Sequence, residues 1–223
     1  MSYLKLLGLV AVALGATGLA TAASAAAAGG TTLCKSNETP CASTNHYGVG
    51  IKFKATSGAM TLVKTFEKTS ETINCQSSEI AGKVTSTGSA TSNVEAQVET
   101  LYFKECVLTT FGGTQHICMN SWMALPLKAV FANTPGTMNG TFTISNGGVG
   151  EPKMAVKCPV IGGIECIFTA SSLTFDLTGG EKPTLVAKED SLKGSGGFCP
   201  QSLDWNATYT FVEPTPLFLA QSL

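Results

Sequence analysis

The sequence has two histidines that could act as the base of a catalytic triad, and neither has the surroundings of a catalytic residue. A serine hydrolase places its nucleophile in a Gly-x-Ser-x-Gly turn or beside a His that accepts its proton. The nearest string, Gly194-Ser195-Gly196-Gly197, has a different spacing. His46 follows a small polar stretch, and His116 lies close to Cys118. We expect both to be surface loop histidines, and the sequence predicts no catalytic residue and no enzyme.

Acidic and metal-ligating residues also lack the spacing that their chemistry needs. A glycosidase uses two carboxylates that face one bond, and calcium needs several oxygens from an Asp-rich loop. The chain has three Asp, of which Asp176 falls in a predicted strand and Asp204 precedes Trp205. Zinc sites use closely spaced Cys pairs, whereas the shortest spacings here are Cys34–Cys41 and Cys158–Cys166. We therefore expect no metal and no cofactor.

Aromatic side chains are the remaining candidates, because flat rings can stack on sugars. Trp205 and Tyr209 stand four residues apart, so a regular strand carries them on the same face. Such a pair belongs to a packed core more often than to a ligand site. The speculative ligand-binding residues are Trp122, Trp205 and Tyr209.

Eight cysteines, an even number, predict four disulfides in an exported chain. We expect bonds between sequence neighbours, Cys34–Cys41, Cys106–Cys118 and Cys158–Cys166, with Cys75–Cys199 joining the two halves. A second pattern rests on a faint internal similarity between Ile73-Asn74-Cys75 and Ile164-Glu165-Cys166. It pairs Cys75 with Cys106 and Cys166 with Cys199.

Short runs of β-branched and aromatic residues, separated by Gly- and Ser-rich turns, recur along the chain, and no stretch has the pattern of a helix. The longest alternation, Val94–Glu99, changes phase at Leu101–Phe103, which predicts a bulge or bend near Thr100. The other predicted strands are Ile51–Lys54, Met60–Phe66, Glu71–Cys75, Ile80–Ser86, Thr141–Ser145, Met154–Cys158, Glu165–Thr169, Leu173–Leu177, Thr184–Ala187 and Trp205–Val212.

The fold class that follows is all-β, with roughly a dozen antiparallel strands in one or two disulfide-linked β-sandwiches. We expect an N-terminal arm over residues 26–50 that holds a local Cys34–Cys41 loop. The β-sandwich region covers residues 51–223 and can be divided into two halves, 51–135 and 136–223. One large sandwich and two smaller ones both remain open.

Residues 1–25 have the features of a cleaved signal peptide. A single Lys precedes an apolar stretch from Leu6 to about Ala20, and Ala23-Ser24-Ala25 forms an A-x-A cleavage site. The apolar stretch is rich in Gly and Ala and shorter than the ~20 strongly apolar residues of a membrane span. We expect a secreted, extracellular protein with no membrane insertion after cleavage.

Composition excludes one class of partner. The 223 residues carry a net charge of −1, charged residues make up 13%, and every basic residue is Lys. Nucleic-acid binding depends on clustered Lys and Arg that neutralise phosphates. With 43% hydrophobic residues the chain can form a packed core. We expect a folded protein that does not bind nucleic acid.

The closing segment 205–218, with Trp205-Asn206-Ala207-Thr208-Tyr209 at its start, resembles that of uncharacterised secreted, cysteine-containing all-β proteins of actinobacteria. Segments 177–185 and 197–200 and the series Cys75, Cys106, Cys118 are similar to theirs as well. The resemblance extends over the mature chain. It implies a secreted β-rich protein and supplies no catalytic residue, since the group has no assigned activity.

The sequence thus favours a secreted, non-enzymatic β-sandwich protein with an extracellular interaction or structural role, whose partner is a protein or a glycan. A carbohydrate-binding module that uses an exposed Trp is the first alternative. A secreted hydrolase or inhibitor is the second.

Overall fold

A computed structural model describes residues 30–65, 70–109, 114–123, 125–145, 151–157, 165–195, 199 and 201–222. The described residues form β-strands and one short 3-10 helix, η1 (Ser43–Asn45). The strands are β1 (Thr31–Cys34), β2 (Lys52–Ser57), β3 (Met60–Thr65), β4 (Ser70–Ser86), β5 (Val94–Thr109), β6 (Gln115–Met123), β7 (Leu127–Asn133), β8 (Gly140–Ser145), β9 (Lys153–Lys157), β10 (Glu165–Thr169), β11 (Ser172–Thr178), β12 (Thr184–Ser195), β13 (Ser202–Glu213) and β14 (Phe218–Gln221).

Alternation of apolar and polar residues explains why these segments form strands. In β11, Leu173, Phe175 and Leu177 are buried, and every residue between them is exposed. The same period of two runs through β7 and β8. Because successive side chains of a strand point to opposite faces, such segments need a sheet with one dry face and one wet face. The predicted all-β, antiparallel class is confirmed.

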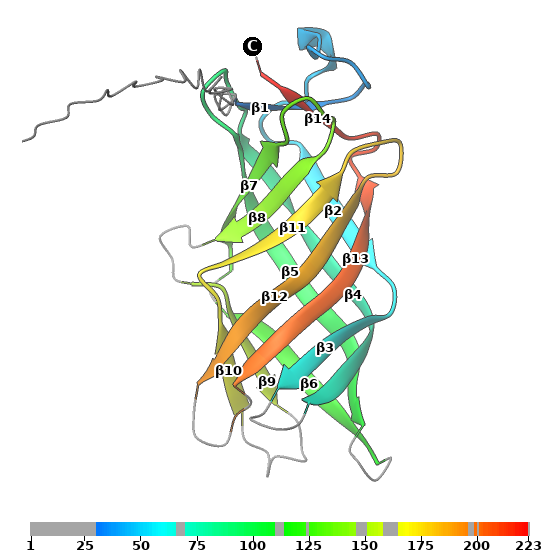
Figure 1. Ribbon diagram of the computed structural model, residues 1–223, viewed down its shortest axis with the longest axis vertical. Coiled ribbons are helices and arrows are strands. Elements are labelled where there is room, and N and C mark those ends of the chain that lie inside the picture. The colour runs from blue at the N-terminus through cyan, green and yellow to red at the C-terminus, as the bar shows by residue number, and fades with distance from the viewer. Residues whose placement is uncertain are drawn as a thin grey trace, which may run out of the picture.

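The main sheet closes on itself. Its strand order is β10-β9-β6-β5-β7-β8-β11-β12-β13-β2-β4-β3, and further pairings join β10 to β12, β5 to β4 and β13 to β3. Every pairing is antiparallel, and the strands form a tall tube (Figure 1). The sandwich of two facing sheets is not confirmed, because one continuous sheet surrounds the core instead.

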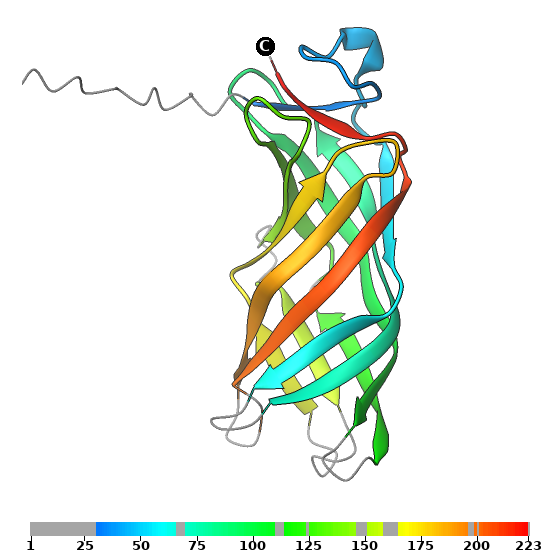
Figure 2. The same ribbon diagram turned by 45° about the vertical axis from the view of Figure 1, so that its right-hand side comes forward.

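Two stacked rings share the long strands of the tube. The upper ring consists of β2, β4, β5, β7, β8, β11, β12 and β13, and the lower ring of β3, β4, β5, β6, β9, β10, β12 and β13. The shared strands β4, β5, β12 and β13 run from one ring into the other (Figure 2). The two segments 51–135 and 136–223 therefore pair in one sheet, for example through β13–β2 and β6–β9.

Aromatic side chains fill the interior of the upper ring. The Phe53 ring of β2 lies 5.6 Å from the Phe142 ring of β8, on the opposite wall, and 5.8 Å from the ring of Phe131. Phe175 joins this group to Trp205, with 5.2 Å between ring centroids. Eight strands enclose an interior just wide enough for side chains to fill. Contacts between opposite walls show that side chains occupy it at this level.

The long strand pair β4–β5, which both rings share, contains shifts in its pairing register. Along the β4–β5 pair, Ala81 faces Thr100 but Gly82 faces Val98, so Glu99 is an extra residue. This confirms the bulge predicted near Thr100. Gly82 also allows a close approach, because a Cβ there would lie 1.9 Å from the Gln97 carbonyl oxygen and 2.8 Å from the Phe53 ring.

The strands β1 and β14 pair across the upper end of the tube (Figure 1). Leu33 and Leu219 from these strands belong to the buried core, so the ribbon of two strands covers the end of the aromatic interior. We call this β1–β14 ribbon, together with the Cys34–Cys41 loop, the cap. Thr31 and Asn133 fix the ribbon to the tube: the Asn133 backbone N–H donates to Thr31 Oγ1 over 2.7 Å, and its side-chain N–H donates to the Leu219 carbonyl over 2.9 Å. The expected N-terminal arm thus contributes a strand and the Cys34–Cys41 loop.

The observed disulfides contradict most of the pairing pattern that the sequence favours. Cys34–Cys41 is confirmed, but the other observed bonds are Cys75–Cys106 and Cys166–Cys199, as the repeat-based alternative predicts. Cys106 faces Cys75 on one side and Cys118 on the other, so the predicted Cys106–Cys118 neighbours are adjacent but not bonded to each other. Cys118 is disulfide-bonded, and Cys158 lies outside the described residues. The predicted Cys75–Cys199 and Cys158–Cys166 bonds are wrong, because Cys75 bonds to Cys106 and Cys166 bonds to Cys199.

Candidate functional site

The predicted sugar-stacking residues of β13 lie inside the tube. Trp205 and Tyr209 are both 0% exposed, with 6.0 Å between their ring centroids. The sequence correctly places them on the same face of one strand. That face points inward because odd-numbered positions of β13 face the core and even-numbered positions such as Asn206 and Thr208 face solvent. Their proposed role in stacking on a glycan is therefore wrong.

Tyr209 carries the polar link of this core. Its hydroxyl lies 2.7 Å from Oγ of the buried Ser78, whose own hydroxyl donates to the Tyr102 carbonyl over 2.8 Å. Burial raises the pKa of Tyr209, and hydrogen bonds of Ser78 and Trp205 act in the opposite direction. The phenol is therefore neutral at physiological pH and acts as a fixed hydrogen-bonding group between β4 and β13.

Trp122 belongs to β6, and its backbone pairs with Met154 of β9. Its side chain lies outside the part of the chain that the structure describes. Its assignment as a ligand-binding residue stays a prediction.

The two histidines occupy opposite ends of the molecule. His46 follows η1 beside the cap, and its Nε2 lies 3.1 Å from the Cys41 carbonyl oxygen. His116 faces Leu108 from β6, a strand in the lower part of the tube (Figure 1). Both are half-buried in secondary structure or its flank, rather than in open loops. They cannot act on one substrate together.

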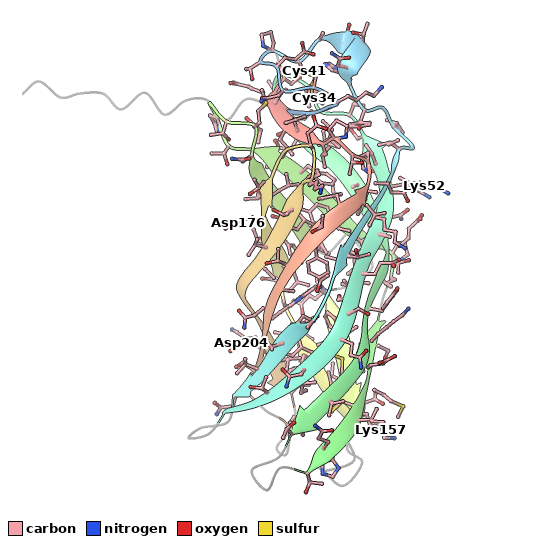
Figure 3. All side chains as sticks on the ribbon, turned by 90° about the vertical axis from the view of Figure 1, so that its right-hand side faces the viewer. Cys34, Cys41, Lys52, Lys157, Asp176 and Asp204 are labelled. Carbon is pink, nitrogen blue, oxygen red and sulfur yellow. A yellow bond between two sulfur atoms is a disulfide. The ribbon has the colours of Figure 1, made fainter. Side chains whose placement is uncertain are left out.

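One group of metal-ligand types occurs among the described residues: Cys34, Glu38 and Cys41. It does not fit a metal, because both sulfurs form the Cys34–Cys41 disulfide and a metal needs thiolates. Hydrogen bonds from Asn45 and Ser36 lower the pKa of Glu38 and already engage its carboxylate. Both Cys residues lie in the cap at the upper end (Figure 3).

Hydroxyl groups dominate one side of the outer surface. A row of four threonines in register crosses four strands, with Thr56 facing Thr210, Thr210 facing Thr184 and Thr184 facing Thr178. The hydroxyls of Thr143 and Thr174, from β8 and β11, lie 3.3 Å apart. We call this surface the hydroxyl face and define it by the outward positions of β8, β11, β12 and β13; Thr56 of β2 lies at its border with the opposite side.

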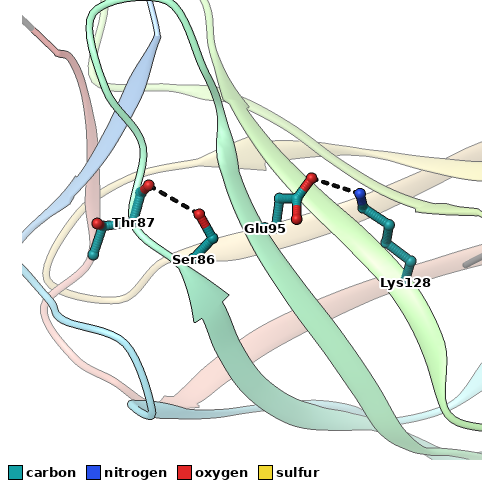
Figure 4. Close-up of polar contacts among 4 residues, drawn as sticks. All are labelled: Ser86, Thr87, Glu95 and Lys128. Carbon is teal, nitrogen blue, oxygen red and sulfur yellow. Dashed lines mark hydrogen bonds and ion pairs between the residues drawn. The ribbon is translucent and has the colours of Figure 1, made fainter.

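Ion pairs cover the opposite side, formed by β2, β4, β5 and β7. Lys54 Nζ lies 2.8 Å from Glu79 Oε2, and Lys83 Nζ lies 2.7 Å from Glu99 Oε1. Lys128 of β7 pairs with Glu95 of β5 near the upper end, close to Ser86, whose hydroxyl donates to the Thr87 carbonyl (Figure 4). We call this surface the ion-pair face. Long charged side chains project from this side of the tube, as Lys52 illustrates (Figure 3).

Two surface hollows lie where the rings separate. One, of about 400 Å³, lies over β13 where its partner changes from β2 to β3, and Ala59, Ala207 and Thr208 help to line it. The other, of about 270 Å³, lies at the turn from β10 to β11, between Glu151 and Lys193. Small or hydroxylated residues form most of both linings. The hollows can hold small polar groups of a larger partner.

Comparison with known proteins finds no matching family model, no matching curated protein and no matching solved structure. Within the described ranges, no helix is long and apolar enough to cross a membrane.

Neither outer face was predicted from the sequence. The signal was present in the Thr residues that alternate with apolar ones, but strand order decides which of them share a surface.

Proposed function

We propose that this chain is a secreted, non-enzymatic protein that binds an extracellular partner, a protein or a glycan, through the outside of its tube. The observation that carries the proposal is the aromatic interior, in which rings from opposite walls are in contact. Side chains occupy the space that a ligand-carrying tube would leave open. A partner therefore has to bind to the outer surface of the tube.

Disulfides support the extracellular part of the proposal. The described residues form three complete bonds and Cys118 is also disulfide-bonded, and disulfides persist in oxidising compartments. The A-x-A motif Ala23-Ser24-Ala25 ends six residues before Thr31, where β1 begins. Cleavage after Ala25 leaves the cap strand intact.

The hydroxyl face is the favoured contact surface. Its outward residues offer many hydroxyl donors and acceptors beside a few charges such as Asp176 and Asp204, whereas the opposite face carries three ion pairs among the described residues. A neutral, hydroxyl-bearing partner such as a glycan loses little solvation energy on such a surface. A carbohydrate therefore remains a candidate ligand, with a binding site on the hydroxyl face instead of at the buried Trp205.

Binding assays on the oxidised protein, starting at Ala26, test the proposal. Glycan and protein arrays and co-sedimentation with insoluble cellulose, chitin and peptidoglycan should give saturable binding to at least one probe. The variant Thr174→Lys/Thr210→Lys should reduce that binding at least tenfold. The matched variant Lys83→Thr/Lys128→Thr, on the ion-pair face, should retain it.

Three results would contradict the proposal. They are binding that the threonine variant leaves unchanged, turnover of ester or glycoside substrates, and absence of binding to every probe. Export is tested separately by the mass of the secreted chain, which should start at Ala26 and contain no free thiol.

A further inference from the structure

Two large apolar side chains are exposed side by side on the outside of β6. Ile117 is 71% exposed and Met119 is 64% exposed. Val49 and Val212 are the other large hydrophobic residues that are exposed among the described ones, and they lie on separate segments. Half-buried Val107 of β5 faces Ile117 directly. We call Val107, Ile117 and Met119 the β6 patch.

Charges of opposite sign flank the β6 patch. Lys157 of β9 faces Met119 across the strand pair on one side, and it lies near the lower end of the tube (Figure 3). On the other side, the pairing of β5 with β6 ends where Cys106 faces Cys118, and Glu105 is the next residue of β5 toward the level of Met119. The Glu105 backbone is left-handed, with a φ of 50°. Glu105 and Lys157 are both exposed. On the Lys157 side the rim also holds the exposed Glu165, which faces Lys157 from β10. An apolar centre with a polar, charged rim is typical of a protein–protein interface.

The arrangement is complementary to itself. In a two-fold dimer, a residue at one position contacts a residue at a second position, and the second contacts the first. An axis that runs along β6 brings each β6 patch onto its copy. The same rotation places Glu105 of one chain against Lys157 of the other, and this contact occurs twice.

Strand addition is not available to the strands of the main sheet. The pairings β10–β12 and β13–β3 close the main sheet, and a closed sheet offers no edge to another strand. Self-association therefore has to use side chains on the outer surface.

We propose that a second copy of this chain docks on the β6 patch and forms a side-by-side, two-fold dimer. The proposal goes beyond the proposed function and is independent of the hydroxyl face, which involves other strands. Two convex tubes touch along a narrow strip, so the interface is smaller than the 1,200–2,000 Å² of stable complexes. The dimer is therefore weak and depends on concentration.

Sedimentation velocity of the oxidised protein, from about 1 µM to 1 mM, tests this assembly. The weight-average sedimentation coefficient should rise from monomer toward dimer. Met119→Lys should lower the association constant at least tenfold, because two cations then meet at the axis. Val212→Lys, which adds the same charge to an exposed apolar site away from β6, should leave the constant unchanged.

A charge swap tests the geometry itself. Glu105→Lys and Lys157→Glu should each weaken association about tenfold, since each creates two like-charged contacts. The double variant Glu105→Lys/Lys157→Glu should restore association, because the opposite charges meet again. A monomer at every concentration, a dimer that resists Met119→Lys, or a double variant weaker than both single ones would overturn the proposal.

Discussion

At the scale of single residues, one buried hydroxyl contact joins two long strands of the tube. Ser78 is 2% exposed and is one of few buried polar side chains among the described residues. It contacts Tyr209 of β13, a strand that only β2 or β3 separates from β4 in the sheet. A buried polar group is stabilising only while its partner is present. This contact therefore favours one register of β4 against β13.

The first prediction concerns this contact. Tyr209→Phe and Ser78→Ala should each lower the free energy of unfolding by about 1–3 kcal/mol, because each removes the hydrogen bond between these two buried hydroxyls. Ser78→Ala should cost more, since Ser78 keeps its bond to the Tyr102 carbonyl in Tyr209→Phe. The double variant should lose less than the sum of the two, because the contact is counted twice in the sum. Urea unfolding measures all four proteins. Additive losses would show that the two hydroxyls do not interact.

The second prediction concerns alkaline pH. Burial raises the pKa of Tyr209 in the folded chain above the unfolded value of about 10, so the unfolded state releases this proton first. The stabilisation is complete below pH 10 and falls as pH rises above it, by about 1.4 kcal/mol per pH unit. Tyr209→Phe should lack this part of the slope. Parallel stability curves of the two proteins between pH 9 and 11 would contradict the assignment.

At the scale of elements, the cap depends on close backbone approach. A Cβ at Gly88 would lie 1.6 Å from the Thr31 carbonyl oxygen, and a Cβ at Gly140 would lie 2.8 Å from a Leu219 methyl carbon. Both contacts hold the β1–β14 ribbon against the tube. Glycine at these sites serves packing, because no other residue leaves room for the ribbon.

The third prediction follows from this packing. Gly88→Ala should displace β1 and lower stability by about 2 kcal/mol, within the range for overpacking. Gly58→Ala is the matched control, since a Cβ there meets nothing within 4 Å. Thermal unfolding compares the two, and hydrogen exchange should show faster exchange in β1 and β14 of the first variant. Equal stability of the two variants would contradict the described cap.

The fourth prediction concerns the bond between the long strands. Cys75 and Cys106 close a loop with a sequence separation of 31 residues, whereas Cys34 and Cys41 are 7 apart. Replacing the first pair by Ala should cost about 3–4 kcal/mol, and replacing the second about 2–3 kcal/mol. Urea unfolding measures both losses. A larger loss from the short loop would contradict the expected order.

Strand content and the phase change near Thr100 could be predicted from the sequence, because alternation and its interruption are local signals. Segments predicted as separate strands, 71–75 and 80–86, belong to the single strand β4, and no strand was expected at β6 or β7. Closure depends on pairings such as β13–β3, between residues far apart in the chain. The burial of Trp205 could not be predicted for the same reason. The sequence predicts its strand, but which face of that strand is buried depends on the strands that surround it.

At the scale of the whole molecule, two rings that share four strands form one cooperative structure. Four strands pair in both rings: β4, β5, β12 and β13. A shared strand that separates from its neighbours in one ring therefore also disturbs the pairing in the other ring. The Cys75–Cys106 disulfide joins two of these shared strands, β4 and β5. The result is a filled, closed interior with two different outer faces.

The most direct test is the exchange of the Trp205 indole N–H with solvent, followed by NMR on 15N-labelled protein with Trp122→Phe used to assign the two indole signals. Trp205 is 0% exposed inside the closed sheet, so its N–H should exchange only through global unfolding and should ignore added sugars. Exchange within minutes under native conditions, or a signal shifted by a sugar ligand, would contradict a filled interior.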